Sequence, residues 1–213
     1  MFGGAFDPPH SSHLEMARCA VRQLALDELR VIPTGQAWHK DHVLSPAVHR
    51  IAMSHLAFDG ESRLVVDPRE TLRPGPSYTV DTLQELQTQN PGAQLYLLLG
   101  GDQARDLPTW KRWQELLPIA IFCIASRGVK IADNGPTGAN TSESQESLES
   151  TWSHIADAGG RCVQLNLPPD AVSSTHIRQW VAQNPDFGQA PGTMVKPSVA
   201  SYIAQHHLYL EPR

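Results

Sequence analysis

Two histidines stand three residues apart, directly after a glycine-rich bend near the start of the sequence. Gly3 and Gly4 form the bend, and His10 and His13 open an amphipathic helical pattern. Paired glycines let a backbone approach a ligand closely, and a helix N-terminus presents N–H groups and the positive end of its dipole to an anion. Because the histidines share one helix face, both are expected to donate to the same phosphate.

A second set of phosphate-binding groups lies far along the chain, where residues 173–175 read Ser-Ser-Thr. Their hydroxyls are suited to cap a helix whose apolar face includes Ile177 and Val181. Arg178 falls near the first turn of that helix, where its planar guanidinium can bind a phosphate through two parallel hydrogen bonds. An ordinary helix cap with a surface arginine is the alternative interpretation of this segment taken alone.

The loop from Pro33 to Lys40 follows a predicted strand and ends in two basic residues, His39 and Lys40. Lys40 is the candidate for a cation that closes over a phosphate chain, with His39 in support. A solvated surface loop is the alternative. His39 and His42 also have the spacing of a metal-ligand pair, but no third ligand stands at a suitable spacing.

The segment of residues 73–83 is a rigid turn that leads into a helix. Tyr78 and Thr79 stand at the start of that helix. They offer a hydroxyl, backbone N–H groups and an aromatic ring to a planar, carboxylated ligand. A helix cap and a tyrosine at the edge of the core are the alternative.

The buried strand predicted at residues 95–99 is followed by a glycine pair and a carboxylate, including Gly100 and Asp102. Trp110 comes soon after, where its ring is suited to stack on a flat heterocycle. Trp113, three residues later, is expected to lie in the core. Asp102 has the alternative role of capping the next helix.

The elements that must position these residues alternate between strand and helix. Short apolar runs bounded by turn residues predict buried strands, and helical apolar spacing predicts helices. The predicted strands are residues 29–32, 64–66, 95–99 and 119–124. The predicted helices are residues 14–24, residues 45–58 and a third that runs from residue 80 up to the turn at residues 90–92. This alternation predicts an α/β fold with a Rossmann-like, doubly wound parallel sheet and helices on both faces, in which ligands bind at the carboxyl ends of the strands.

A single domain is expected for a chain of 213 residues. Residues 131–150 are dominated by Gly, Pro, Asn, Ser and Glu and predict a polar insertion. Residues 175–209 predict a C-terminal helical segment, whose part from Val195 to Tyr209 is expected to pack as a terminal helix or to form a subunit contact. The oligomeric state therefore stays open. Only two residues precede the first glycine, so either the first strand is unusually short or several native residues are missing.

The formal net charge of −5 gives no support for sequence-independent binding to nucleic acid or to an acidic membrane. Cys19, Cys123 and Cys162 are widely separated, and their spacing is not that of metal ligands. They are expected to be reduced, mostly buried thiols. No signal-like segment opens the sequence and no apolar run approaches the length of a bilayer, so a soluble, cytoplasmic protein is expected.

Together these motifs resemble those of the nicotinate-mononucleotide adenylyltransferase family, within the nucleotidylyltransferase superfamily. Residues 3–13 resemble its glycine-turn and HxGH motif, and residues 172–178 resemble its ISSTxIR-like segment. Residues 73–83 closely resemble the SYTxDTL segment that separates this family from related adenylyltransferases. The resemblance covers nearly the whole chain, and two motifs at opposite ends are more specific than either alone.

The resemblance implies transfer of AMP from ATP, accompanied by Mg²⁺, to nicotinate mononucleotide, which gives nicotinate adenine dinucleotide and pyrophosphate in NAD biosynthesis. These small molecules are the expected partners, without nucleic acid or membrane. The residues assigned to catalysis are His10, His13, Lys40 and Arg178. Those assigned to ATP are Gly3, Gly4, Ala5, Phe6, Gly100, Asp102, Ser173, Ser174 and Thr175. Those assigned to nicotinate mononucleotide are His39, Tyr78, Thr79 and Trp110. No residue is assigned to a protein-bound metal.

Two positions depart from the family pattern. Ser12 stands where the HxGH box has glycine, and Ala5 stands where threonine or serine is frequent. Ser12 adds a side chain where the backbone approaches nucleotide, and Ala5 lacks a hydroxyl donor. Weakened or altered binding is expected, rather than lost chemistry.

Three other functions remain open at this point. The first is a sister adenylyltransferase acting on nicotinamide mononucleotide or on phosphopantetheine, although the Tyr78 and Trp110 segments argue against phosphopantetheine. The second is a nucleotide-binding regulatory module that has lost catalysis, which the two departures and the short N-terminus motivate. The third is a histidine-based metallohydrolase that uses the two HxxH pairs.

Overall fold

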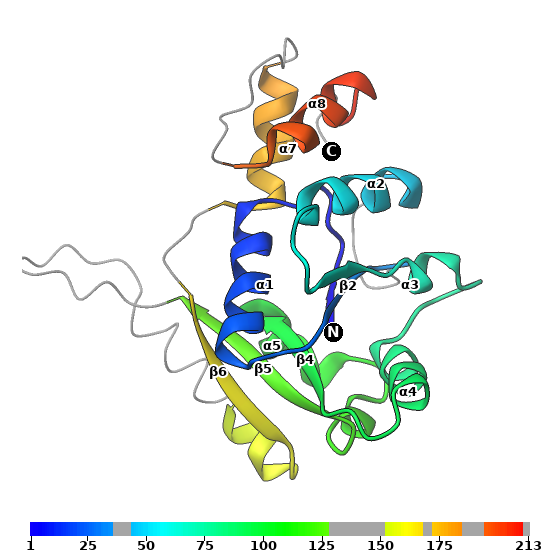
Figure 1. Ribbon diagram of the computed structural model, residues 1–213, viewed down its shortest axis with the longest axis vertical. Helices are drawn as coiled ribbons and strands as arrows, with labels where there is room; N and C mark the ends of the chain where they lie inside the picture. Colours follow the sequence, from blue (N-terminus) through cyan, green and yellow to red (C-terminus); the bar gives the residue numbers. More distant parts are fainter. Residues whose placement is uncertain (36–43, 128–151, 168–171, 185–193, 211–213) are drawn as a thin grey trace, which may run out of the picture. The chain divides into compact units, whose positions relative to one another are not determined.

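The computed structural model describes residues 1–35, 44–127, 152–167, 172–184 and 194–210 (Figure 1). It divides into two compact units. Unit 1 consists of Met1 and Tyr78–Pro169, and unit 2 consists of Phe2–Ser77 and Asp170–Arg213. Each unit has its own set of parallel strands.

Unit 2 is built on alternating strands and helices. In chain order they are β1 (Phe2–Gly4), α1 (Ser11–Gln23), β2 (Leu29–Pro33), α2 (Ala47–Phe58), β3 (Leu64–Val66), α3 (Arg69–Leu72), α7 (Ser174–Gln183) and α8 (Pro197–Gln205). The strands pair in parallel in the order β3-β2-β1, with Phe2 opposite Val31 and Leu29 opposite Leu64. This is the strand order of one half of a doubly wound sheet.

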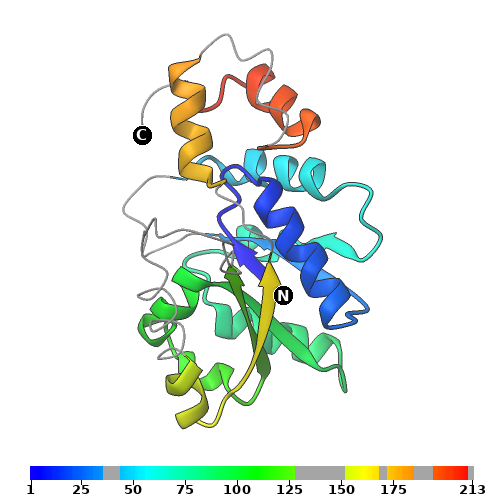
Figure 2. The same cartoon turned by 90° about the vertical axis from the view of Figure 1, so that its left-hand side faces the viewer.

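The helices of unit 2 cover its strands with their apolar faces. Leu14, Ala17 and Ala20 form the buried stripe of α1 at helical spacing. Helix α2 packs against β2 and β3, and α8 packs against α2, as Figure 2 shows. Val199 and Ile203 are the buried residues of α8. The C-terminal elements are therefore part of the core of this unit.

Unit 1 repeats the parallel arrangement. Its elements are α4 (Thr79–Gln89), β4 (Leu95–Gly100), α5 (Gly101–Asp106), the 3-10 helices η1 (Leu107–Thr109) and η2 (Trp113–Leu116), β5 (Ala120–Arg127), a helix at residues 152–157 and β6 (Arg161–Leu167). The strands follow the order β4-β5-β6, the other half of a doubly wound sheet. Met1 lies beside β4, since its ammonium group donates to the Tyr96 carbonyl at 2.7 Å and its carbonyl accepts from the Leu98 N–H at 2.9 Å.

The predicted α/β class with parallel strands is confirmed, and β1 is short, at three residues. Strand β6 was not predicted, because it carries alternating polar residues and only Leu165 in it is buried. The predicted helical segment at residues 175–209 contains two helices, α7 and α8, whose intervening residues 185–193 lie outside the described part. The predicted insertion at residues 131–150 also lies outside it, and the prediction of a single domain stays a prediction.

The cysteines are mostly buried, as predicted, and one other prediction about burial needs correction. Cys19 and Cys123 are buried and Cys162 on β6 is half-buried; all three thiols are free. Trp113 was expected in the core, but it is the first residue of η2 and is half-buried. The buried residue of this short helix is Leu116. None of the helices in the described ranges combines the length and apolar character needed to cross a membrane.

Candidate active site

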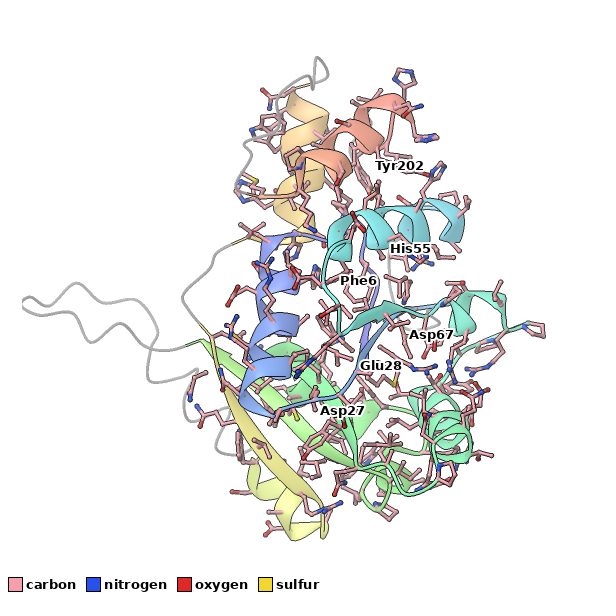
Figure 3. All side chains as sticks on the ribbon, viewed as in Figure 1. Phe6, Asp27, Glu28, His55, Asp67 and Tyr202 are labelled. Carbon is pink, nitrogen blue, oxygen red and sulfur yellow. The ribbon has the colours of Figure 1, made fainter. Side chains whose placement is uncertain are left out.

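The glycine-rich bend turns sharply after β1 to bury Phe6. The φ angle of Phe6 is 48°, in the left-handed region, and its ring makes edge contacts with Phe2 and Phe58 at centroid distances of 5.3 and 5.9 Å. Figure 3 shows Phe6 in the interior beside α2. A Cβ atom on Gly4 would stand 3.1 Å from the Phe6 ring. Glycine at this position therefore gives the ring room to fold back against the strand.

His10 and His13 meet at the start of α1, as their spacing predicts. Their rings stack at a centroid distance of 3.7 Å. The backbone N–H of His10 donates to Nδ1 of His13 at 3.3 Å. Since Nδ1 accepts, the proton of the neutral His13 ring is on Nε2, which makes that atom a hydrogen-bond donor. The first turn of α1 contains no acidic residue that would compete with an anion.

The first and second motifs are joined directly, although they come from opposite ends of the sequence. The Ser174 hydroxyl donates to the Pro8 carbonyl at 2.9 Å, and Nη1 of Arg178 donates to the Asp7 carbonyl at 2.8 Å. Ser12 contributes a third bond, from its hydroxyl to the Val172 carbonyl at 3.1 Å. In Figure 2 the N-terminal end of α7 accordingly lies beside the start of α1.

Helix α7 begins as predicted. Ser173 is its N-cap and accepts from the His176 N–H at 3.2 Å. Ile177 and Val181 are buried on its apolar face. Thr175 accepts a hydrogen bond from Nη2 of Arg178 at 3.2 Å. Two donors of Arg178 are thus engaged with the protein, and a guanidinium group has five.

Ser12 has a structural role that the sequence did not predict. The serine was expected to alter nucleotide binding, because the family has glycine there. Its hydroxyl bonds the residue that precedes the cap of α7, and its effect on nucleotide binding stays a prediction. The side chain therefore helps to hold the two motifs together.

A buried polar network under the bend was also missed. Asp7 accepts from the Ser45 N–H and from the Tyr209 hydroxyl, while Arg50 donates to the Ser45 carbonyl at 2.9 Å and to the Ala5 carbonyl at 3.0 Å. Burial lowers the pKa of Arg50, an effect that the nearby Asp7 charge opposes. Burial and the Asp7 charge both raise the pKa of Tyr209. The acidic residue inside the first motif was the only sequence signal for this network.

Of the loop expected to carry a mobile cation, only the first residues, up to Gly35, are among the described residues. Lys40, His39 and His42 lie outside the described residues. At the start of the loop, the Thr34 N–H donates to the Gly4 carbonyl at 2.8 Å. A Cβ on Gly35 would stand 2.1 Å from the Glu70 carbonyl oxygen, so only glycine fits this approach of two backbones.

Of the residues assigned to nicotinate mononucleotide, Tyr78, Thr79 and Trp110 lie in unit 1 and are linked within it, whereas His39 lies outside the described residues. Tyr78 is the half-buried N-cap residue of α4, and Thr79 is its first residue. Arg112 follows Trp110 by two residues and donates to Asp81 of α4 at 2.9 Å. This ion pair connects the half-buried Trp110 segment to the helix that Tyr78 opens.

Gly100 is the last residue of β4, one residue further than the predicted strand, and Asp102 follows β4. Gly100 is the N-cap residue of α5, and its N–H donates to the Gln103 side chain at 3.3 Å. Asp102 does not cap this helix; its side chain is 89% exposed and forms an ion pair with Arg105. Among the described residues, no cluster of three or more His, Cys, Asp or Glu side chains is arranged to hold a metal ion.

Comparison with known proteins gives one consistent family. Residues 1–180 match the family model described as cytidylyltransferase-like. Two curated relatives, both named "Probable nicotinate-nucleotide adenylyltransferase", are similar over their whole length. The protein from Albidiferax ferrireducens is 47% identical over 209 residues, which cover 98% of this chain and 96% of the relative. The protein from Methylibium petroleiphilum is 40% identical over 213 residues, which cover 100% of this chain and 92% of the relative.

Solved structures share the Rossmann-like fold. The Plasmodium falciparum nicotinic acid mononucleotide adenylyltransferase complexed with NaAD aligns with a TM-score of 0.70 at 22% identity, covering 99% of this chain and 97% of that chain. The same enzyme complexed with APC aligns with a TM-score of 0.68 at 21% identity, with the same coverage. At this identity the structures show the fold, and the closer sequence relatives show the family. The chain belongs to the nicotinate-nucleotide adenylyltransferase family.

Proposed function

We propose that this protein transfers AMP from ATP to nicotinate mononucleotide, forming nicotinate adenine dinucleotide and releasing pyrophosphate. The observation that carries the proposal is the direct bonding of the two motifs within unit 2. It brings the paired histidines of α1 and the capped, arginine-bearing start of α7 to the same glycine-rich bend. Two helix N-termini with cationic and N–H donors are suited to bind a polyphosphate.

The chemistry needs positioning more than an activated side chain. The phosphate of the mononucleotide is already an anionic nucleophile, and one of its oxygens attacks the α-phosphorus of ATP in line. A new P–O bond forms as the bond to the β-phosphate bridging oxygen breaks, and pyrophosphate leaves with that electron pair. No serine or cysteine nucleophile is required.

His13 is proposed to stabilise the charge that develops during transfer. Its Nε2 is the donor, because Nδ1 is engaged by the His10 N–H. His10 stacks on His13 and limits the orientation of its ring. A donor held in place before the reaction stabilises transition-state charge without a cost of reorganisation.

The remaining phosphates are assigned to Arg178 and Lys40. Arg178 lies at the joined motifs with further N–H donors beyond its two protein contacts. The role of Lys40 stays a proposal from the sequence. Mg²⁺ is proposed to enter with ATP and to neutralise phosphate charge, since it is commonly held by phosphate oxygens, water and few protein ligands.

Recognition of the nicotinate group is assigned to unit 1. Trp110 is proposed to stack on the ring, and the start of α4 at Tyr78 and Thr79 is proposed to bind the carboxylate. The support is the Arg112–Asp81 ion pair, which ties the two segments together. An aromatic face beside a helix N-terminus suits a flat, anionic heterocycle.

The test is pyrophosphate release from ATP and Mg²⁺ with nicotinate mononucleotide and nicotinamide mononucleotide offered in parallel. We expect strong preference for the nicotinate form. Equal use of both would keep the reaction type but contradict the proposed carboxylate recognition. ATP binding without release from either substrate would contradict the proposed reaction and favour a regulatory module.

A further inference from the structure

A buried carboxylate lies beneath the glycine-rich bend, at Asp7. Its residue is only 1% exposed. One carboxylate oxygen accepts from the Ser45 N–H at 2.9 Å, and the other accepts from the Tyr209 hydroxyl at 2.5 Å. A buried carboxylate is unfavourable unless it is hydrogen-bonded. These two donors therefore stabilise Asp7 in the interior.

The bend that Asp7 supports adopts a conformation that needs support. Phe6 precedes Asp7 with a φ of 48°, and bulky side chains seldom occupy this region. Such a conformation persists where surrounding contacts over-determine it. On one side of Phe6 in the sequence, the Ala5 carbonyl accepts a hydrogen bond from Arg50. On the other side, the Asp7 carboxylate accepts a hydrogen bond from the Ser45 N–H. A change in the Asp7 contacts is thus expected to shift the bend.

Tyr209 donates the hydrogen bond to Asp7 that comes from furthest along the sequence. It follows α8, stands 202 positions along the sequence from Asp7, and is buried. The φ of Tyr209 is 64°, so Tyr209, like Phe6, is held in the left-handed region. Because burial and the Asp7 charge raise the pKa of Tyr209, its hydroxyl stays protonated at neutral pH and donates a hydrogen bond to the carboxylate.

We propose that Tyr209 is a positioning residue for AMP transfer, whose hydroxyl acts through Asp7 to hold the bend that places His10 and His13. The role rests on the proposed function. His10 is three residues from Asp7 in the sequence, so a shifted bend moves the start of α1. Misplacement of reacting groups by about 1 Å can lower a rate by about 100-fold.

The test variant is Tyr209→Phe, which keeps the ring and removes the hydroxyl. We expect kcat to fall about 10- to 100-fold, with each KM changed less than about threefold because the lost effect is on the transition state. Hydrogen–deuterium exchange in residues 2–14 should become faster. The stoichiometry of ATP binding should stay at that of the wild type, which excludes loss of folded protein as the cause.

The matched control is Tyr202→Phe, on α8 (Figure 3). It removes the hydroxyl that lies 3.0 Å from Nδ1 of His49, away from the bend. We expect its kcat and the exchange of residues 2–14 to equal those of the wild type. A second variant, Asp7→Ala, removes both carboxylate acceptors and supplies a double-mutant cycle. Adding Tyr209→Phe to it should lower kcat no further, because the hydroxyl no longer has the carboxylate through which it acts.

The outcomes separate this inference from the proposed function. An active wild type with an equally active Tyr209→Phe variant would overturn the positioning role and leave the proposed function standing. Faster exchange without loss of kcat, additive losses in the cycle, or ATP stoichiometry that falls in step with kcat would each overturn it as well. A wild type that releases no pyrophosphate from either mononucleotide would contradict the proposed function, and the positioning role with it.

Discussion

Replacing His13 with Asn is expected to separate the two tasks of its ring. Nδ1 accepts the His10 N–H at 3.3 Å, and Nε2 carries the proton assigned to the phosphate. The Asn amide oxygen can take the place of Nδ1 and keep the bond from His10. The side chain is too short to place a donor where Nε2 stood, whereas Gln is one methylene longer and can do so. His13→Asn therefore keeps the acceptor and loses the donor at the Nε2 position, whereas His13→Gln keeps a donor there and gives up the Nδ1 acceptor.

The contacts of His13 give the expected magnitude of two effects, the loss of kcat and the loss in the free energy of unfolding. Loss of one donor aimed at transition-state charge costs about 10²- to 10³-fold in kcat. The ring also stacks on His10 at 3.7 Å and makes an edge contact with Phe6 at 5.0 Å. Such aromatic pairs contribute about 0.5–1.5 kcal/mol each, so the free energy of unfolding should fall by about 1–3 kcal/mol in both variants.

The assay is pyrophosphate release at saturating ATP, Mg²⁺ and nicotinate mononucleotide, with urea unfolding measured in parallel. We expect His13→Asn to lose about 10²- to 10³-fold in kcat and His13→Gln to recover about tenfold of it. Unchanged kcat with weaker ATP binding in His13→Asn would refute the transition-state role. Equal losses in the two variants, at equal stability, would refute the assignment of the role to Nε2.

Three other predictions follow from the described contacts. Gly35→Ala should lower the free energy of unfolding in urea by about 1–3 kcal/mol, because its Cβ would meet the Glu70 carbonyl. The control is Gly100→Ala, where φ is −73° and an added Cβ would stand 4.0 Å from the Gln103 side chain; it should lose less, and equal losses would contradict the close approach at Gly35. Arg178→Lys should lower kcat/KM for ATP about 10- to 100-fold, since an ammonium group cannot reproduce the fork that bonds Asp7 and Thr175; undiminished kcat/KM would show that the planar geometry is not used. Burial raises the pKa of Cys123 to about 12 and of Cys162 to about 11, and it raises the pKa of Cys19 as well. At pH 8 native Cys123 and Cys162 should therefore react with a disulfide reagent more than about 100-fold more slowly than in guanidinium chloride, and native Cys19 should also react more slowly. Rapid labelling of Cys123 or Cys162 in the native protein would be inconsistent with this burial.

The parts of the site that follow from local rules were predictable. The stacked contact of His10 and His13 follows from a spacing of three residues on a helix. The start of α7 follows from Ser173, whose side chain caps the helix from within three residues. Both signals are contained in a few neighbouring residues, so the sequence alone carries them.

The parts that depend on distant contacts were not predictable from the same rules. The Ser12 hydroxyl bonds the Val172 carbonyl, which lies 160 positions away. Tyr209 had only an apolar helical pattern before it, and its bond to Asp7 spans 202 positions. The residues joined by each of these bonds leave no mark on the hydrophobic periodicity of the sequence around their partners. Whether such a hydroxyl faces solvent or forms a hydrogen bond is decided only when the chain folds.

These long-range bonds explain how the two ends of the sequence can share one task. In unit 2, the bend after β1 receives hydrogen bonds from α2, from α7 and from Tyr209, so its geometry is fixed by residues from three separate parts of the chain. In unit 1, the segments assigned to the nicotinate group are linked by an ion pair between residues only 31 positions apart. On the proposed assignment, the phosphate chemistry would depend on contacts from three parts of unit 2, whereas recognition of the base would depend on contacts formed within one local segment.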